Sequence, residues 1–247
     1  MRILFLVATL LLVPRISSAQ DPSVLIRSAV EYWRGTTSYT KARMTVHRPD
    51  WERTMGFESW TKGEDDSLVR FTEPSKDAGN ASLMLKREMW SYAPKVNKVI
   101  KIPPSMMNQS WMGSDFSHSD LAKQTDIIDQ YTHRLLGTES HEGKKLYVIE
   151  AIPKETSAIV WGKEILKVRE DYLIIERSFF DQEMKLVKKL TAREIAPSGK
   201  KLVAKLVRME KAEVPDEWTE VYHSEILFEV PMEDTLFTLS HLSNPRR

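Results

Sequence analysis

The chain has 247 residues, with 36 lysines and arginines against 35 acidic residues, a formal net charge of +1 and no cysteine. This near-neutral balance excludes the concentrated basic stripe that nucleic acid requires, and a chain without cysteine has no disulfides. The lysine clusters at residues 185–189 and 200–201 are interleaved with core-type residues, so we expect them to form solvated faces of strands.

The N-terminus has the order of regions found in secretory signal peptides. Met1-Arg2 carries positive charge, residues 3–13 are apolar, and Ser17-Ser18-Ala19 supplies small residues for cleavage. The apolar run of about 11 residues is too short to span a membrane, which takes about 20, and no cysteine follows that could carry lipid. We therefore predict a cleaved signal peptide at residues 1–19 and one exported, unlipidated domain at residues 20–247. The alternative is that residues 3–13 form a buried helix of the folded domain.

The first element of the predicted domain is a helix. Asp21-Pro22-Ser23 has the chemistry of a helix start, and apolar residues recur at helical spacing up to Trp33, before Gly35 ends the pattern. After Gly35 the period changes to two. Apolar and polar residues alternate from Ala42 to Val46, which indicates a strand with one wet face and one dry face.

Further strand-like runs, separated by turn residues, occupy residues 55–60, 67–71, 81–86, 88–92, 95–102, 131–137, 145–152, 164–169, 173–180, 184–190, 201–209 and 222–230. Several of them, such as residues 146–149, are apolar on both faces, so something must cover each face of the sheet. We predict a mainly β fold with a strongly curved antiparallel sheet of about 11 strands. Its concavity would be filled by the first helix, by residues 105–130 or by residues 233–242.

The segment at residues 103–121 interrupts the strand pattern. It places three methionines, Trp111 and Phe116 in a region whose other residues are typical of loops. Because methionine is unbranched and polarizable, such a cluster suits contact with irregular apolar partners such as acyl chains. The alternative is that these side chains only pin a long loop onto the sheet.

Six stretches of this sequence carry a family resemblance, at residues 71–74, 76–79, 83–85, 89–95, 110–121 and 234–239. The longest is Ser110-Trp111-Met112-Gly113-Ser114-Asp115-Phe116-Ser117-His118-Ser119-Asp120-Leu121. With these stretches the chain resembles the bacterial outer-membrane lipoprotein-sorting protein family. The resemblance implies a LolA/LolB-like fold, which is an unclosed antiparallel β half-barrel wrapped over a few helices, with an apolar cavity for acyl chains. It also implies a periplasmic location.

The resemblance extends to partners and function. It implies a periplasmic lipid or lipoprotein carrier, or chaperone, that binds acyl chains and works in outer-membrane lipoprotein or lipid trafficking. The partners would be an inner-membrane transporter of the resistance-nodulation-division (RND) type or an outer-membrane acceptor. We expect the cavity or its lid to be formed by Met44, Phe71, Trp90, Tyr92, Met106, Met107, Trp111, Met112 and Phe116. One parity of each strand would face inward, with Trp90 and Tyr92 on the inner face of their strand.

Enzyme chemistry has weaker support in the sequence. Asp115, His118 and Asp120 fall within a short stretch and could form a metal set, but the same residues suit loop capping and a helix start at Ser119-Asp120. No Gly-x-Ser-x-Gly elbow, HExxH pair or phosphate loop is present. We therefore expect no catalytic residue, metal or cofactor. Two alternatives to the carrier stay open: a protein-binding accessory module of an envelope export pump, and a metal-dependent hydrolase at Asp115 and His118.

Overall fold

The structure, a computed structural model, describes residues 20–245. The predicted signal peptide at residues 1–19 lies outside the described residues. The predicted first helix is α1, Pro22–Arg34, and it begins and ends as its sequence indicates. The Asp21 side chain accepts a hydrogen bond from the Ser23 amide at 2.8 Å, and Gly35 follows the last turn with φ at 65°. A side chain at Gly35 would be strained at this positive φ, so glycine is suited to the sharp exit into the first strand.

The remaining chain is mostly β-structure. The strands are β1 (Thr37–Arg48), β2 (Trp51–Lys62), β3 (Asp66–Glu73), β4 (Ala81–Leu85), β5 (Glu88–Ala93), β6 (Lys98–Lys101), β7 (Tyr131–His141), β8 (Lys144–Pro153), β9 (Lys163–Arg169), β10 (Ile174–Phe180), β11 (Leu186–Ser198), β12 (Lys201–Lys211) and β13 (Trp218–Phe228). The short helices are α2 (His118–Ala122), α3 (Asp126–Asp129) and α4 (Leu239–Ser243), with 3-10 turns at Pro94–Val96, Pro104–Met106 and Asp234–Leu236.

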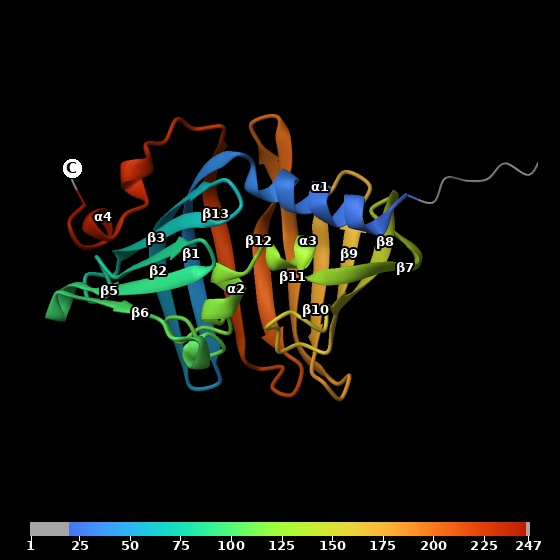
Figure 1. The fold of residues 1–247 in the computed structure, drawn as a ribbon, viewed down its shortest axis with the longest axis horizontal. Helices are drawn as coiled ribbons and strands as arrows, with labels where there is room; N and C mark the ends of the chain where they lie inside the picture. The colour runs from blue at the N-terminus through green and yellow to red at the C-terminus, as the bar shows by residue number, and fades with distance from the viewer. Residues whose placement is uncertain (1–19, 246–247) are drawn as a thin grey trace, which may run out of the picture.

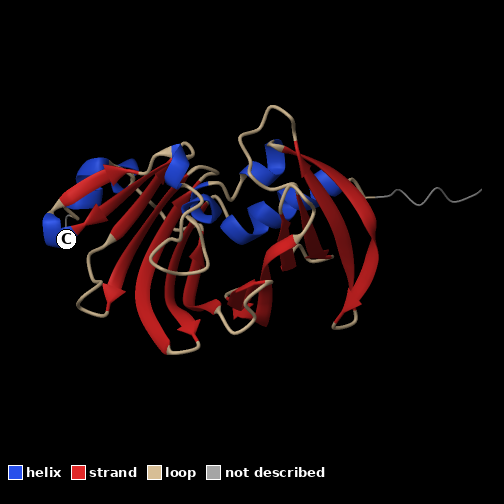
Figure 2. Ribbon diagram, turned by 90° about the horizontal axis from the view of Figure 1, so that it is seen from below, coloured by secondary structure: helices blue, strands red, loops and turns tan. Residues whose placement is uncertain are grey.

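All 13 strands found within residues 20–245 belong to one antiparallel sheet with the order β6-β5-β4-β3-β2-β1-β13-β12-β11-β10-β9-β8-β7. Two meanders, β1 to β6 and β7 to β13, are therefore joined side by side where β1 pairs with β13. The sheet curves around α1, α2 and α3 (Figures 1 and 2). This is the predicted half-barrel, with slightly more strands than the expected 11 or so, because each predicted run forms a strand of its own.

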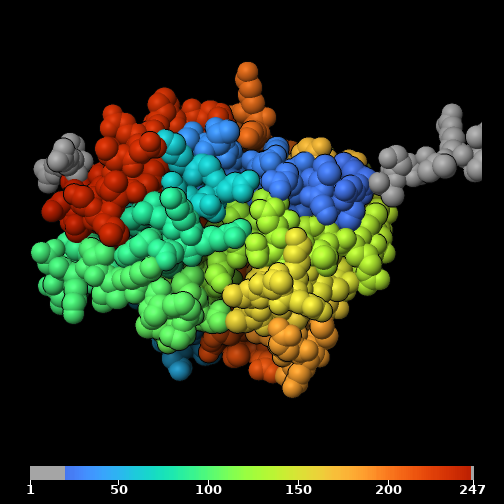
Figure 3. Space-filling view, viewed as in Figure 1, coloured from blue at the N-terminus to red at the C-terminus, as the bar shows by residue number. Residues whose placement is uncertain are grey.

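The connection from β6 to β7 has to cross the whole sheet, because these two strands lie at its opposite edges. Residues 102–130 make this crossing through the concavity and carry α2 and α3 (Figure 1). Together with α1 and with loop 154–162, between β8 and β9, they cover the concave face (Figure 3). We call residues 102–130 the crossing segment.

The C-terminal residues cover the other face of the sheet near β3 to β5. Phe237 and Leu242 pack with Leu68 and Leu83 in one buried cluster. Strands β3 to β5 are therefore covered on both faces. Residues 233–242 therefore cover the convex side and do not fill the concavity.

Two local predictions need correction. The helix expected to start at Ser119-Asp120 begins earlier, because Ser117 is its N-cap and forms a reciprocal capping box with Asp120. The strand expected at residues 95–102 begins only at Lys98, because Pro94 starts a 3-10 turn instead of extending the chain.

Candidate functional site

A cavity of about 880 Å³ lies between the concave face of the sheet and the elements that cross it. Ligand pockets in proteins have volumes of roughly 300 to 1,000 Å³, so this cavity lies at the upper end of that range. Apolar side chains from both meanders line much of it, including Phe57, Val69, Met84, Met89, Leu190, Val207, Met209 and Val221. The crossing segment adds Met107, Trp111, Phe116 and Leu121.

The concave face is filled on one side of this cavity. Met44, Met55 and Met89 are 0% exposed, and Phe71 is 1% exposed. They pack beneath Trp111, whose ring lies 5.2 Å from that of Phe71. We call this region, from β1 to β5 under residues 102–117, the packed wall.

The middle of the sheet is different. Leu190, Ala192 and Val207, on β11 and β12, line the cavity and remain partly accessible to solvent, although they lie on the concave face. We call these three residues the open wall. Beyond it, α1 and α3 pack on β8 and β9 in a second core that includes Ile26, Ile127 and Leu166. The cavity therefore lies between two filled cores.

The crossing segment is anchored to the sheet by its most specific motif. Both oxygens of the Asp115 carboxylate accept hydrogen bonds from Arg48 at 3.0 Å, and the Thr219 hydroxyl donates to the same carboxylate at 2.7 Å. The Trp111 indole nitrogen donates to the Ser82 hydroxyl at 3.0 Å. These buried polar contacts fix the loop over the packed wall.

Charged side chains also line the cavity, and most of them are paired with a carboxylate. Arg177 donates to Glu164 at 2.5 Å, and the Tyr131 hydroxyl donates to the other oxygen of the same carboxylate. Burial, together with the Glu164 charge, raises the pKa of Tyr131. Arg87 lies 2.9 Å from Asp126, whose pKa is raised by burial although Arg87 opposes the shift.

The position of Lys188 contradicts one expectation from the sequence. The cluster at residues 185–189 was expected to be a solvated face, but the Lys188 side chain is buried on the concave side and pairs with Asp120 of α2. Its ammonium group also lies 5.0 Å from the centre of the Phe179 ring. In a strand, every second residue lies on the same face. Lys188 therefore lies on the opposite face from Lys185 and Lys189, and it can point into the concavity while they point away from it.

His223 is the buried histidine of the cavity wall. Its Nδ1 lies 3.0 Å from the carbonyl oxygen of Ala204, and its ring packs edge-on against Trp33 of α1. Burial lowers the pKa of His223 to about 4. The side chain is therefore neutral near pH 7.

The structure separates the predicted site residues into groups. Met107, Trp111 and Phe116 line the cavity, whereas Met44 and Phe71 lie within the packed wall. Met112 packs against the packed wall, and Met106 is 38% exposed.

Trp90 and Tyr92 lie on the opposite face of the sheet, so the predicted orientation of their strand is wrong. They pair with Leu83 and Ala81 of β4 and pack under the C-terminal residues. The residues of this strand that line the cavity are Met89 and its neighbour Glu88. The alternation in the sequence correctly grouped the residues of β5 into two faces. It could not show which face lies on the concave side of the sheet, because both faces are covered.

Sequence reasoning missed the open wall and most of the polar lining. The available signal was the alternation in β11 and β12, which places Leu190 with Ala192 and Val207 with Met209 on shared faces. No local pattern in the sequence reveals the contacts that Arg34, at the end of α1, makes with the distant residues Gly63 and Asp66.

The alternative of a metal site at Asp115 and His118 has no geometric support. The Asp115 carboxylate is held by Arg48 and Thr219, and the structure joins it to no histidine. Within residues 20–245, no group of three or more potential side-chain ligands is close enough to hold a metal ion. None of the helices in this described range is long and apolar enough to cross a membrane.

Comparisons with known proteins agree with this architecture. A family model described as an uncharacterized protein matches residues 63–244. No curated protein matches the chain. Among solved structures, a DUF1329 family protein from Desulfovibrio piger is 26% identical, with a TM-score of 0.81, and the match covers 90% of this chain and 99% of that protein.

Two further structures carry the fold assignment. A domain described as an outer membrane lipoprotein-sorting protein, from Vibrio parahaemolyticus, is 21% identical with a TM-score of 0.79 over 90% of this chain and 98% of its own. A LolA superfamily protein from Nitrosomonas europaea is 21% identical with a TM-score of 0.75 over 90% of this chain and all of its own, 100%. These similarities confirm the predicted resemblance at the level of the fold. The chain therefore belongs to the family of uncharacterized proteins whose model covers residues 63–244, and its fold is that of the LolA superfamily and the outer-membrane lipoprotein-sorting domains.

Proposed function

We propose that this protein is a periplasmic carrier that holds the acyl chains of a lipid or lipoprotein in the cavity beneath the crossing segment. The observation that carries the proposal is the open wall, where Leu190, Ala192 and Val207 line about 880 Å³ of space and keep partial solvent access. A filled core would bury them as completely as it buries Met44.

The physical need for such a space is large. An acyl chain in water costs about 0.8 kcal/mol for each exposed CH₂ group, so a long chain needs an enclosed apolar site to cross an aqueous compartment. The cavity is roofed by α1, the crossing segment and loop 154–162, none of which is a strand of the sheet, and side-chain hydrogen bonds help to hold them together above the cavity. The Lys123 ammonium, for example, donates to the Ala158 carbonyl at 3.2 Å. Such contacts can open for loading without breaking the sheet.

The comparisons support the class of function, because the fold neighbours include a lipoprotein-sorting domain and a LolA superfamily protein. The predicted signal peptide at residues 1–19 supports export, and the absence of cysteine supports an unlipidated product. Both features suit a carrier that diffuses between membranes. Such a carrier would receive its cargo from an RND-type transporter or deliver it to an outer-membrane acceptor.

The experiment that tests the proposal is native mass spectrometry of the protein expressed from its full sequence in a bacterial host and purified from the envelope. We expect mass adducts that disappear on organic extraction and that contain acyl chains. A matched variant, Ala192→Phe, fills the open wall and should purify with at least tenfold less lipid. A wild-type protein that is empty under every mild purification condition would overturn the carrier proposal.

A protein-binding accessory role is the second candidate, and one feature favours it. Strand β7 is an 11-residue edge strand, and Leu136 on it is 47% exposed. An unprotected edge can accept a strand from another protein. A protein free of lipid that nevertheless retains a membrane protein, and that loses it on Leu136→Pro substitution, would favour this role.

A further inference from the structure

The concave face changes character along β1, β2 and β3. One row across these strands is Ser38, Thr61 and Ser67, and the next row includes Thr40 and Ser59. All five hydroxyl side chains line the cavity. Further along the same strands the rows become apolar and lead into the packed wall. The cavity therefore has a hydroxyl-rich end, which we call the polar end, and an apolar remainder.

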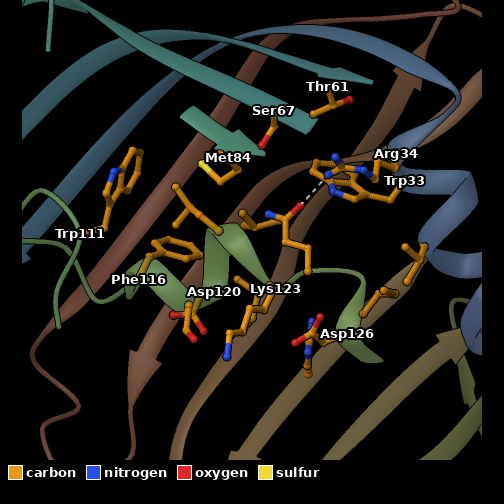
Figure 4. Close-up of a pocket in the computed structure, with 18 of the residues that line it drawn as sticks. Trp33, Arg34, Thr61, Ser67, Met84, Trp111, Phe116, Asp120, Lys123 and Asp126 are labelled. Atoms are coloured by element: carbon orange, nitrogen blue, oxygen red, sulfur yellow. Dashed lines mark hydrogen bonds between the residues drawn. The ribbon is translucent and has the colours of Figure 1, made fainter. Parts of the chain in front are cut away.

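Arg34 lies at the polar end, beside Thr61 and Ser67 (Figure 4). The residue is 6% exposed. Its guanidinium donates to the carbonyl oxygens of Gly63 at 2.7 Å and Asp66 at 3.0 Å, and to the Gln124 side chain at 3.3 Å. All three acceptors are neutral. Within residues 20–245, no carboxylate lies within ion-pair distance of Arg34, in contrast to Arg87 and Arg177.

The negative charges nearest to Arg34 lie outside the cavity. Glu64 and Asp65 lie in the β2–β3 turn and are exposed to water, and Asp66 is the first residue of β3. Their charges favour the ionised form of Arg34, whereas burial lowers its pKa. An arginine side chain remains charged in proteins, so Arg34 is a buried cation that lacks a direct anionic partner.

Donor capacity also remains at this end. A guanidinium carries five N–H groups, and the three hydrogen bonds of Arg34 leave one N–H on each terminal nitrogen. Buried charges are ordinarily paired, because an unpaired one costs free energy. A ligand oxyanion at the polar end would supply the missing charge and accept from the hydroxyl groups around it.

We propose that the polar end binds the anionic head group, a carboxylate or phosphate, of an amphiphile whose acyl chain occupies the apolar remainder of the cavity. This inference rests on the carrier function proposed above and adds the chemistry and the orientation of the ligand. The chain would run from Arg34 toward Phe116 and the open wall, since these lie in the apolar part of the same cavity. Single-chain amphiphiles isolate the head-group question from the number of chains.

The test compares four single-chain amphiphiles that have closely matched alkyl chains and different head groups. Palmitate, hexadecyl phosphate, hexadecanol and hexadecyltrimethylammonium would displace the neutral fluorescent probe N-phenyl-1-naphthylamine, at pH 8 and below their micellar concentrations. We expect at least one of the two anions to bind tenfold or more tightly than hexadecanol, and the cation to bind most weakly, because charge-assisted hydrogen bonds are stronger than neutral ones. Preference for palmitate or for hexadecyl phosphate would assign the head group as carboxylate or phosphate.

The variant Arg34→Gln should reduce this preference to less than threefold and leave hexadecanol binding within about twofold of wild type. Arg70→Gln is the matched control, because Arg70 also donates to backbone carbonyls but lies on the opposite face, under the C-terminal residues. It should keep the full preference for anions. If Arg34→Gln fails to fold, the double variant Thr61→Val, Ser67→Ala should lower the preference at least threefold.

The outcomes separate the two proposals. Equal binding of hexadecanol and both anions to the wild-type protein would overturn the head-group site and leave the carrier function standing. Retention of the full preference by folded Arg34→Gln would also overturn it. Failure of every amphiphile to displace the probe would contradict both proposals.

Discussion

The packed wall and the open wall are built from strands of the same sheet with similar alternation, yet one is a core and the other lines a cavity. Over the packed wall, Trp111 fills the space above Phe71, and its loop is fixed by Asp115 and Ser82. Over the open wall, a cavity separates the covering elements from the sheet, so Leu190 and Val207 remain partly accessible to solvent. The difference lies in what crosses each part of the sheet and not in the strands themselves.

The largest effect should come from removing the residue that fills the packed wall. Trp111→Ala deletes a large buried side chain that contacts Phe57 and Phe71, so we expect the free energy of unfolding to fall by about 3 to 5 kcal/mol. Urea unfolding followed by far-UV circular dichroism measures this change. The matched change Phe116→Ala, at a partly exposed residue of the cavity lining, should cost less than half as much. Equal losses would show that Phe116 is packed as fully as Trp111 and does not line a cavity.

The second effect concerns pH, through His223 beside the open wall. Burial lowers the pKa of His223 to about 4, whereas an unfolded chain has a histidine pKa near 6.5. As the pH falls from about 6.5 to 4, the unfolded state takes up a proton that the folded state does not, so stability decreases, by at most about 3 kcal/mol.

The check is to compare wild-type protein with His223→Gln by urea unfolding at pH 7.5 and pH 4.5. The variant should lose clearly less stability between these pH values than the wild type. Burial also lowers the pKa of His118 and His133, so part of the dependence should remain in the variant. Identical losses in both proteins would mean that His223 is not buried as a neutral group.

A smaller and more selective effect is expected from a pair of alanines. Ala42 is 4% exposed in the packed wall, and Ala192 is partly exposed in the open wall. Phenylalanine at position 42 overpacks a full core and should destabilise the protein by about 1 to 3 kcal/mol. Phenylalanine at position 192 enters empty space, so stability should change by less than about 1 kcal/mol while amphiphile binding falls at least tenfold.

These two quantities are measured by urea unfolding and by probe displacement on the same protein samples. If Ala192→Phe destabilises as strongly as Ala42→Phe, the space beside β11 and β12 is a filled core. If it leaves binding unchanged, the ligand lies elsewhere.

Local signals in the sequence predicted local structure well. The chemistry of Asp21 and Gly35 predicted both ends of α1, because helix caps are satisfied by neighbouring residues. Alternation predicted the strands, and the Ser110 to Leu121 motif correctly drew attention to the segment that covers the sheet. The family resemblance predicted the half-barrel fold.

The rest depended on long-range packing. Alternation cannot tell which side of β5 is inside when both sides are covered, so Trp90 was placed on the wrong face. It also cannot reveal that Lys188 turns inward, since the partner that makes its burial tolerable, Asp120, comes from a separate helix. The contacts of Arg34 join the end of α1 to a turn and to the crossing segment, and no spacing in the sequence reports them.

The most direct test of the carrier claim is photo-crosslinking with a palmitate analogue that carries a diazirine near the end of its chain. Irradiation followed by peptide mass spectrometry should place the label on residues of the open wall, such as Leu190 and Val207, and spare Met44 and Met55 of the packed wall. Unlabelled palmitate should compete it away. Labelling confined to exposed apolar residues of the convex face, such as Tyr222 and Leu227, would contradict the account.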